Sequence, residues 1–208
     1  MRSPGFDYQA GGGEAAVDQV GPVLDLLELA FDDAGQVVQA GDGLWPCPED
    51  LDVSLNEVAG AGWIDDAGRR ARDRLRAGAS EAVIGHCDWL ADNLRWSGDE
   101  LLVVHDWDSV TADSEAVLAG FAAALYSAVS ADELATVEDT ERFLVAYCHA
   151  RGREFSAGEL QRSWAAGVWT RAYDAKYQHT AGQPITSLSE NEARERLRRT
   201  GTRPSSFA

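Results

Sequence analysis

The stretch Val83–Ser109, VIGHCDWLADNLRWSGDELLVVHDWDS, decides how the chain is interpreted, because here the apolar periodicity changes from helical to strand-like. Ala82–Ile84 is a short apolar run that predicts a buried strand. Strand-like segments also occur at Leu94–Trp96 and Leu101–Val104, on either side of the turn sequence SGDE at 97–100. The stretch therefore predicts a loop followed by a β-hairpin.

Both flanks of this stretch have helical periodicity with recognisable starts and stops. Helices are predicted from Pro22 to Gly35, over 60–80, and along the nearly apolar run 114–129. Capping-box pairs predict two more helices, which start at Ser130 with Glu133 and at Ser156 with Glu159 and end near Gly152 and His179. A further charged helix is expected in the tail. The expected fold class is mainly α with a small β-hairpin.

Length and composition predict one globular domain. The chain has 208 residues, of which 45% are hydrophobic and 25% charged. Residues 1–13, rich in Gly and Pro, predict a flexible leader; 14–186 form the helical domain and 187–208 a helix and tail. The three cysteines form no CxxC pair, and no run has signal-peptide or membrane-span character, so we expect a cytoplasmic protein.

The charge balance is strongly acidic. Eighteen basic residues against 35 acidic ones give a net charge of -17, which repels nucleic acid and anionic membranes. The same field favours Mg²⁺ or a cationic small molecule, although acidity is also a common means of keeping a protein soluble. Lys176 is the only lysine.

Polar residues around the hairpin have the spacing of a phosphoryl-transfer site. His86, Asp88 and Asn93 follow the pattern HxDxxxxN, and Asp106 comes directly after the second strand of the hairpin. In kinase catalytic loops the Asp of this pattern accepts the proton of the substrate hydroxyl, and the Asn holds a magnesium ion. A hairpin would bring Asn93 and Asp106 to one end, where a second acidic residue can bridge Mg²⁺ to nucleotide phosphates.

Ordinary structural roles are the alternative for each of these residues. His86 can be a satisfied half-buried histidine, Asp88 and Asp92 can cap turns, and Asp106 to Asp108 can be a solvated strand end. Asp108 fits a metal site and a turn cap equally well. For the other candidates, structural roles are expected: packing or hydrogen bonding for His105, a surface or half-buried position for His149, and a helix end for His179. Core packing is expected for Trp164 and Trp169, and the alternative for them is the lining of a substrate cleft.

The ordered pattern resembles the aminoglycoside phosphotransferase and choline kinase-like family, whose usual signature is HGDxxxxN followed by a hydrophobic strand and IDW. The resemblance covers about residues 15–180, with specific motifs only in 83–109. It implies a kinase-like C-terminal lobe, transfer of the ATP γ-phosphate to a hydroxyl of a small molecule, and Mg²⁺ and ATP as cofactors. It also implies Asp88 as catalytic base, His86 as scaffold of the loop, and Asn93 and Asp106 as Mg²⁺ ligands that position the nucleotide.

The sequence departs from the family pattern in three places. Cys87 stands where the family has Gly, and the later GDPxxDL element is absent, with only Asp113 and Glu115 nearby. No lysine precedes His86, and the glycine-rich AGGGEAA at 10–16 follows no strand. We therefore expect the N-terminal β lobe to be missing. The alternative function is an inactive C-lobe that acts as a binding or regulatory module, or is a remnant.

A missing lobe would leave an apolar face uncovered. In kinase-like folds the catalytic loop and hairpin border the cleft between lobes, so Trp89, Leu90 and Trp107 are expected on an exposed inter-lobe face. Exposed apolar patches of this kind usually meet a partner or cause aggregation. We expect self-association or low solubility, unless residues 1–80 cover the site.

Overall fold

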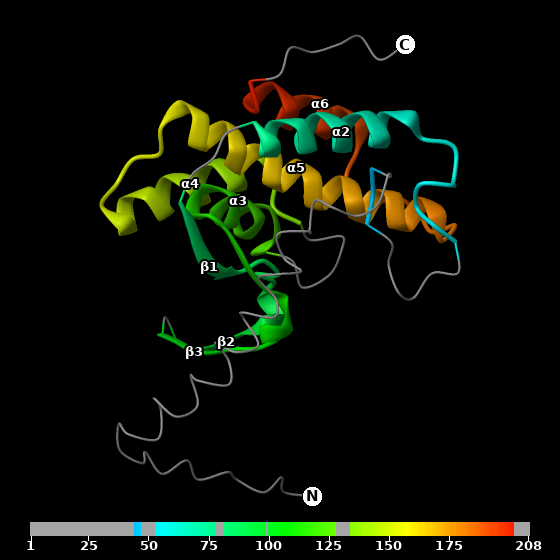
Figure 1. The fold of residues 1–208 in the computed structure, drawn as a ribbon. Coiled ribbons are helices and arrows are strands. Elements are labelled where there is room, and N and C mark those ends of the chain that lie inside the picture. The colour runs from blue at the N-terminus through cyan, green and yellow to red at the C-terminus, as the bar shows by residue number, and fades with distance from the viewer. Residues whose placement is uncertain (1–43, 47–52, 78–80, 99, 128–133, 202–208) are drawn as a thin grey trace, which may run out of the picture.

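The computed structural model describes residues 44–46, 53–77, 81–98, 100–127 and 134–201, and this part of the chain is mainly helical (Figure 1). Its helices are α2 (Gly62–Arg76), α3 (Glu115–Leu125), α4 (Val137–Arg151), α5 (Ala157–Thr180) and α6 (Glu190–Arg199). The predicted leader at 1–13 and the predicted helix from Pro22 to Gly35 lie outside the described residues.

Among the residues described between α2 and α3, four strands are present: β1 (Ala82–His86), β2 (Leu94–Ser97), β3 (Glu100–Val104) and β4 (Val110–Ser114). Strands β2 and β3 form the predicted antiparallel hairpin, with a register shift between Arg95 and Trp96. Strand β4, which was not predicted, pairs antiparallel with β1. The sequence VTADS is too short and polar to show strand periodicity, so only its pairing with β1 makes it a strand.

The prediction that Ala82–Ile84 is buried was wrong. Val83 and Ile84 are exposed, and burial along β1 begins only at Gly85 and His86. A Cβ added at Gly85 would lie 2.7 Å from Leu118 Cδ1, so the strand approaches α3 most closely at its end. The end that enters the loop is therefore the part of β1 that is fixed to the helical body.

Capping pairs mark two of the helix starts. The predicted pair at α5 is confirmed, since the Ser156 hydroxyl accepts from the Glu159 amide and the Glu159 carboxylate accepts from the Ser156 amide. At α4 the cap is Thr136 with Asp139, and the predicted pair at 130 and 133 falls outside the described residues. The pairs at 130 and 133 and at 136 and 139 have the same spacing, so the sequence alone did not select the one that starts α4. Gly152, with φ of 64°, ends α4 as predicted.

Helix α5 is the centre of the helical body. It contacts α2, α3 and α6, and Figure 1 shows α2 and α6 along one side of it, with α3 and β1 on the other. The contact with α3 is a close backbone approach, because a Cβ added at Gly120 would lie 2.1 Å from the Ser163 carbonyl oxygen. The Ser163 hydroxyl donates to the Ala116 carbonyl at 2.7 Å. Two helices that pack this closely fix the start of α3, and hence β4.

The only lysine of the chain is a structural cation. Lys176 on α5 is 1% exposed, and its ammonium group donates to the Val58 carbonyl at 2.8 Å and pairs with Asp65 at 3.0 Å. The Trp45 indole donates to the same carboxylate at 2.8 Å and stacks on Trp169. These bonds fix the segment before α2 to α5, and they confirm the prediction that Trp169 packs in the core.

Helix α6 is part of the same body. The guanidinium group of Arg196 is buried, donates to the Ala135 carbonyl and the Thr140 hydroxyl, and pairs with Glu192. It also lies over the ring of Trp164, whose predicted core position is confirmed. Within the described residues, no helix is long and apolar enough to cross a membrane.

Gly120 offers a direct test of the α3–α5 contact. Because a methyl group there would meet the Ser163 carbonyl, we expect Gly120→Ala to lower the free energy of unfolding by about 2 to 3 kcal/mol in urea titration. Gly62→Ala is the matched control, since nothing lies within 4 Å of its added Cβ, and alanine in a helix should raise stability by about 0.5 kcal/mol. Equal stability of the two variants would contradict the close approach.

Candidate functional site

The loop after β1 is fixed by the side chain of Asn93. Its amide group donates to the Asp88 carboxylate and to the Asp88 carbonyl oxygen, both at 3.0 Å. The Leu90 amide donates to the same carbonyl, and a 3-10 turn, Ala91–Asn93, completes the loop. The two residues of the HxDxxxxN pattern that would carry chemistry are therefore in direct contact. The side-chain oxygen of Asn93, Oδ1, which is the atom that would bind a cation, takes no part in these two bonds.

His86 connects this loop to the end of the hairpin. Its Nε2 lies 2.8 Å from the His105 carbonyl oxygen, and the Asp88 amide donates to its Nδ1 at 3.2 Å. These partners assign the neutral tautomer with the proton on Nε2. The rings of Trp89 and Trp107 meet the imidazole edge-on. His86 thus positions the loop against the end of β3, and both of its ring nitrogens have hydrogen-bond partners.

Asp106 lies at the turn that follows β3, in the left-handed conformation with φ of 66° and ψ of 49°. This conformation is uncommon for a residue with a side chain and marks a constrained turn. The His105 amide donates to the Asn93 carbonyl at 2.8 Å, so the strand end is bonded directly to the loop. The hairpin thus brings Asn93 and Asp106 to the same end, as the sequence predicted.

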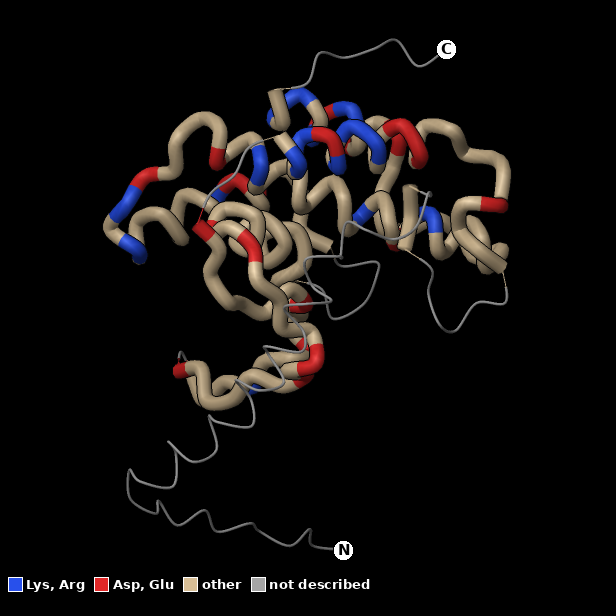
Figure 2. Tube along the Cα trace, in the orientation of Figure 1, with Lys and Arg blue, Asp and Glu red and all other residues tan. Residues whose placement is uncertain are grey.

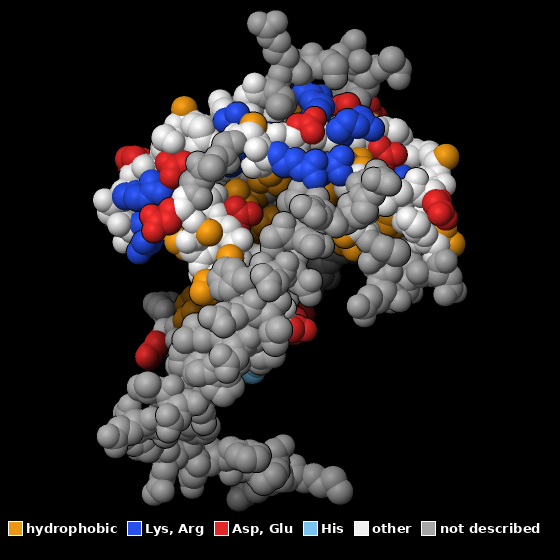
Figure 3. Space-filling view, in the orientation of Figure 1, with side chains coloured by type: hydrophobic (Ala, Val, Ile, Leu, Met, Phe, Trp, Pro, Cys, Tyr) orange, Lys and Arg blue, Asp and Glu red, His pale blue; other side chains and the backbone are white. Residues whose placement is uncertain are grey.

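Three carboxylates influence one another at this end of the hairpin. Asp108 raises the pKa of Asp106, first through a hydrogen bond between the two side chains and then through its charge. The charge of Asp88 adds to the rise. Figure 2 shows acidic residues gathered where the two sheets meet, whereas Figure 3 shows basic side chains over α2 and α6 and at the connection between α4 and α5. A cation would relieve the repulsion among the acids.

The donor set suits a magnesium ion that is shared with a nucleotide. Mg²⁺ prefers oxygen ligands and is commonly bound through one or two carboxylates, with substrate phosphates and water completing the octahedron. Asn93 and Asp106 offer an amide oxygen and a carboxylate. Among the described residues no three His, Cys, Asp or Glu side chains form a group that could hold a metal ion. Within the described part of the chain, the protein ligands alone therefore do not make a closed metal site.

Asp174 on α5 also belongs to the electrostatics of the loop and was not predicted. It is half-buried, and its pKa is raised to about 6, mainly by burial; Arg171 opposes the rise and the charge of Asp88 adds to it. The only signal in the sequence was an acidic residue among aromatic and apolar residues of a predicted helix. Acidic residues of helices more often lie on the face exposed to solvent. Only the tertiary packing turns this position toward Asp88.

The other acidic candidates are engaged elsewhere. Glu115 pairs with Arg151 and Arg153 and accepts from the Tyr147 hydroxyl; the Arg151 hydrogen bond is the main reason that its pKa is lowered. The Asp113 carboxylate accepts from the Ser114 amide. Neither residue substitutes for the missing GDPxxDL element at the loop.

The remaining candidates have local roles. Cys87, in the position where the family has Gly, donates its thiol and its amide to the Ser109 carbonyl, and burial raises the pKa of the thiol. His149 is exposed as expected, and His179 Nε2 lies 3.3 Å from the Ala59 carbonyl oxygen. Asp92 is exposed on the loop. None of these groups adds a reactive side chain to the site.

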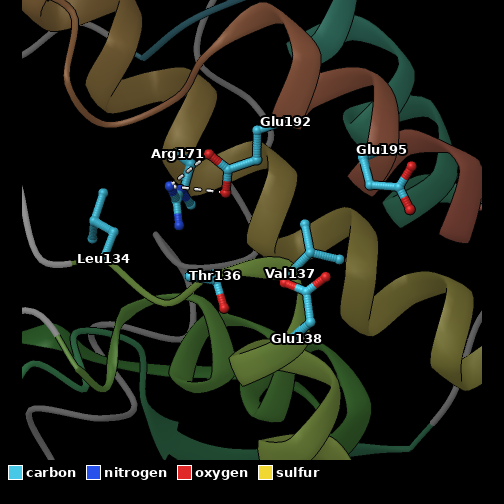
Figure 4. A pocket seen from close by; sticks show the side chains of 7 residues that line it. All are labelled: Leu134, Thr136, Val137, Glu138, Arg171, Glu192 and Glu195. Carbon is cyan, nitrogen blue, oxygen red and sulfur yellow. Dashed lines mark hydrogen bonds and ion pairs between the residues drawn. The ribbon is translucent and has the colours of Figure 1, made fainter.

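A cavity of about 340 Å³ opens at the start of α4 (Figure 4). It is lined by Leu134, Thr136, Val137, Glu138, Arg171, Glu192 and Glu195. Figure 4 shows Arg171 and Glu192 paired across it, and the guanidinium group also donates to the Ala135 and Ser187 carbonyls. Arg171 and Glu192 are thus already paired, and no residue of the Asp88 loop lines the cavity. The hairpin end remains the better candidate site.

Comparison with known proteins assigns no family or function: no family model, no curated protein and no solved structure matches the chain.

The coupling of the hairpin-end acids predicts a change in titration. In Asp108→Asn the like charge is removed, so we expect the pKa of Asp106 to fall toward the ordinary value of 3.8. The measurement is a pH titration of the carboxyl resonances by carbon-detected NMR. Asp92→Asn, an exposed change on the same loop, should leave the Asp106 titration in place. An unchanged Asp106 pKa in the Asp108 variant would show that the two carboxyls do not interact.

Burial of Asp174 predicts a pH-dependent gain in stability from Asp174→Asn. The folded protein binds the Asp174 proton more tightly than the unfolded chain does, so ionisation costs folding free energy once the pH exceeds 3.8, and the cost is complete above about 6. We expect the variant to gain about 1 to 2 kcal/mol at pH 8 and less at pH 5. Urea titrations at both pH values, with the exposed Asp73→Asn as control, measure the difference. A loss of stability at pH 8 would contradict the burial argument.

Proposed function

We propose that the chain is a kinase-like phosphotransferase, related to the aminoglycoside phosphotransferase and choline kinase-like enzymes, that transfers the ATP γ-phosphate to a small-molecule hydroxyl. The observation that carries this proposal is the contact between the Asn93 amide and the Asp88 carboxylate, at the hairpin end that also presents Asp106. These residues occur in the order that the phosphoryl-transfer pattern requires. Chance supplies the spacing often, but seldom with this convergence.

Each residue has a role that its contacts support. Asp88 would accept the proton of the attacking hydroxyl, and its bond to Asn93 holds the carboxylate in one orientation. Asn93 and Asp106 would bind Mg²⁺, which neutralises phosphate charge when it is present. His86 would act as a positioning residue, because both of its nitrogens are bonded to backbone atoms of the loop and strand.

The acceptor is proposed to be a cationic small molecule with a free hydroxyl. The net charge of -17 favours cations over anions throughout the surrounding solvent. Near the loop, Asp174 and Asp108 add negative charge to that of Asp88. Nucleic acid and anionic membranes are poor partners for the same reason.

A second candidate function is a kinase-like C-lobe that binds without catalysis. It is favoured by one observation: the only lysine of the sequence is buried against Asp65 on α2 and cannot reach nucleotide phosphates at the hairpin end. A kinase-like enzyme uses a lysine to hold the α- and β-phosphates. The two functions therefore differ in whether this chain binds MgATP by itself.

Nucleotide binding and turnover distinguish these functions. By calorimetry, we expect the wild-type chain to bind ATP in the presence of Mg²⁺ with a micromolar dissociation constant. Asp106→Ala should weaken this affinity by about tenfold or more, because a magnesium ligand is lost. Asp88→Asn should leave the affinity within about threefold, yet slow phosphate release to water or to an amino-alcohol acceptor by about a hundredfold.

Asp92→Ala is the control, since this exposed acid lies on the same loop outside the proposed ligand set. It should bind and turn over nucleotide like the wild type. Mg²⁺-independent binding, or no ATP binding by the wild type, would refute the enzymatic proposal and favour the C-lobe module. Equal loss of ATP affinity in the Asp88 variant would contradict its role as base.

A further inference from the structure

Helices α2 and α6 carry a basic surface on a protein that is otherwise acidic. Of the 18 basic residues of the chain, nine are arginines of these two helices, which contain only six acids. The two helices contact each other, and Figure 3 shows basic side chains gathered over them on one face. The net charge of the whole chain is -17, so this surface has the opposite sign to its surroundings. A positive surface of this kind attracts a negatively charged partner.

The exposed arginines of the two helices repeat at helical spacing. On α2, Arg69 and Arg76 are seven residues apart, and on α6, Arg194 and Arg198 are four apart, so each pair lies on one side of its helix. The rise of an α-helix separates the first pair by about 10 Å and the second by about 6 Å along the axis. The Arg69 and Arg198 side chains are 55% and 59% exposed. These four arginines are called the basic face below.

Ion pairs within each helix do not commit the basic face to a purely structural role. Arg69 pairs with the acid three residues earlier, Asp66, at 3.8 Å, and Arg198 likewise pairs with Glu195. Pairs between exposed charges on one helix contribute little to stability, because water and salt screen them and both side chains lose rotamer freedom. A carboxylate of a partner can therefore replace the internal acid at small cost.

Exposed acids on the same sides of the helices decide which kind of anion fits. Asp73 lies between Arg69 and Arg76, and Glu190 lies one turn before Arg194. A nucleic acid or an anionic membrane presents closely spaced phosphates, which would meet these acids and the charge of the whole chain. A helix with acidic residues one and two turns apart presents carboxylates at about 6 and 10 Å, the spacing of the arginines. Guanidinium groups bind such carboxylates through two parallel hydrogen bonds.

We propose that the basic face binds an acidic helix of another protein, which lies along α2 and α6 and pairs its carboxylates with Arg69, Arg76, Arg194 and Arg198. The inference is independent of the proposed function, since it uses none of the residues assigned to phosphoryl transfer. The basic face lies on α2 and α6, whereas the candidate site lies at the end of the hairpin. The partner helix therefore leaves that site open.

Binding of a fluorescent acidic peptide to the full chain, followed by anisotropy, tests this surface. The probe is an alanine-rich helical peptide with glutamates four and seven residues apart. We expect it to bind with a micromolar dissociation constant at low salt, and about tenfold more weakly at physiological ionic strength. Arg69→Glu and Arg198→Glu should each weaken binding by about fivefold or more. The matched control is Arg142→Glu, since Arg142 on α4 is exposed and also pairs with an acid three residues earlier. It changes the net charge equally and should leave the affinity within about twofold.

A change of opposite sign tests the same surface with every arginine in place. Asp73→Asn removes an acid from the basic face, so it should strengthen peptide binding by about two- to threefold. Four results would overturn the proposal. They are no peptide binding by the wild type, equal weakening in the Arg142 and Arg69 variants, unchanged or weaker binding in the Asp73 variant, or a tighter complex with another ligand. The other ligands to compare are a single-stranded oligonucleotide, phosphatidylserine vesicles and, by sedimentation, a second copy of the chain.

Discussion

The approach of α3 to α5 at Gly120 is the constraint on which the rest of the described structure depends. A side chain at this position would overlap the Ser163 carbonyl, so the two helices can meet only where the chain has glycine. Helix α3 follows β4 directly, and β4 pairs with β1. The loop that carries Asp88 is therefore held at a fixed place relative to α5. A wider helix spacing would displace the loop from Asp174.

Within that frame, bonds from the His86 and Asn93 side chains and from the backbone assemble the candidate site. The His105 carbonyl bonds to His86, and the Asn93 carbonyl accepts from the His105 amide, so loop and hairpin end form one unit. Asp108 raises the pKa of Asp106 there, first through a hydrogen bond between the two side chains and then through its charge. Shifted carboxyl pKa values are found more often at functional sites than elsewhere on a protein. The contact between Asn93 and Asp88 at this end, more than the spacing alone, supports phosphoryl transfer as the proposed chemistry.

Local signals in the sequence predicted much of the fold, with instructive failures. The capping pair at Ser156 starts α5 as expected. Helix α4 has Thr136 as its N-cap, because the packing of the helix, and not the spacing of the pair, determines where it starts. Strand β4 was missed because its residues are polar and gain their conformation from pairing with β1. The burial expected at Ile84 failed because strand periodicity does not say which end of a short sheet meets a helix.

The sequence by itself determined the helical class, the hairpin, and the order of His86, Asp88, Asn93 and Asp106, since these depend on residue type and short spacing. Only the tertiary structure decided that Asp174 lies near Asp88 and that Lys176 forms an ion pair with Asp65. The physical reason is that periodicity assigns a residue to an element but not to a neighbour. Which groups meet, and at what electrostatic cost, depends on how closely the helices pack around α5.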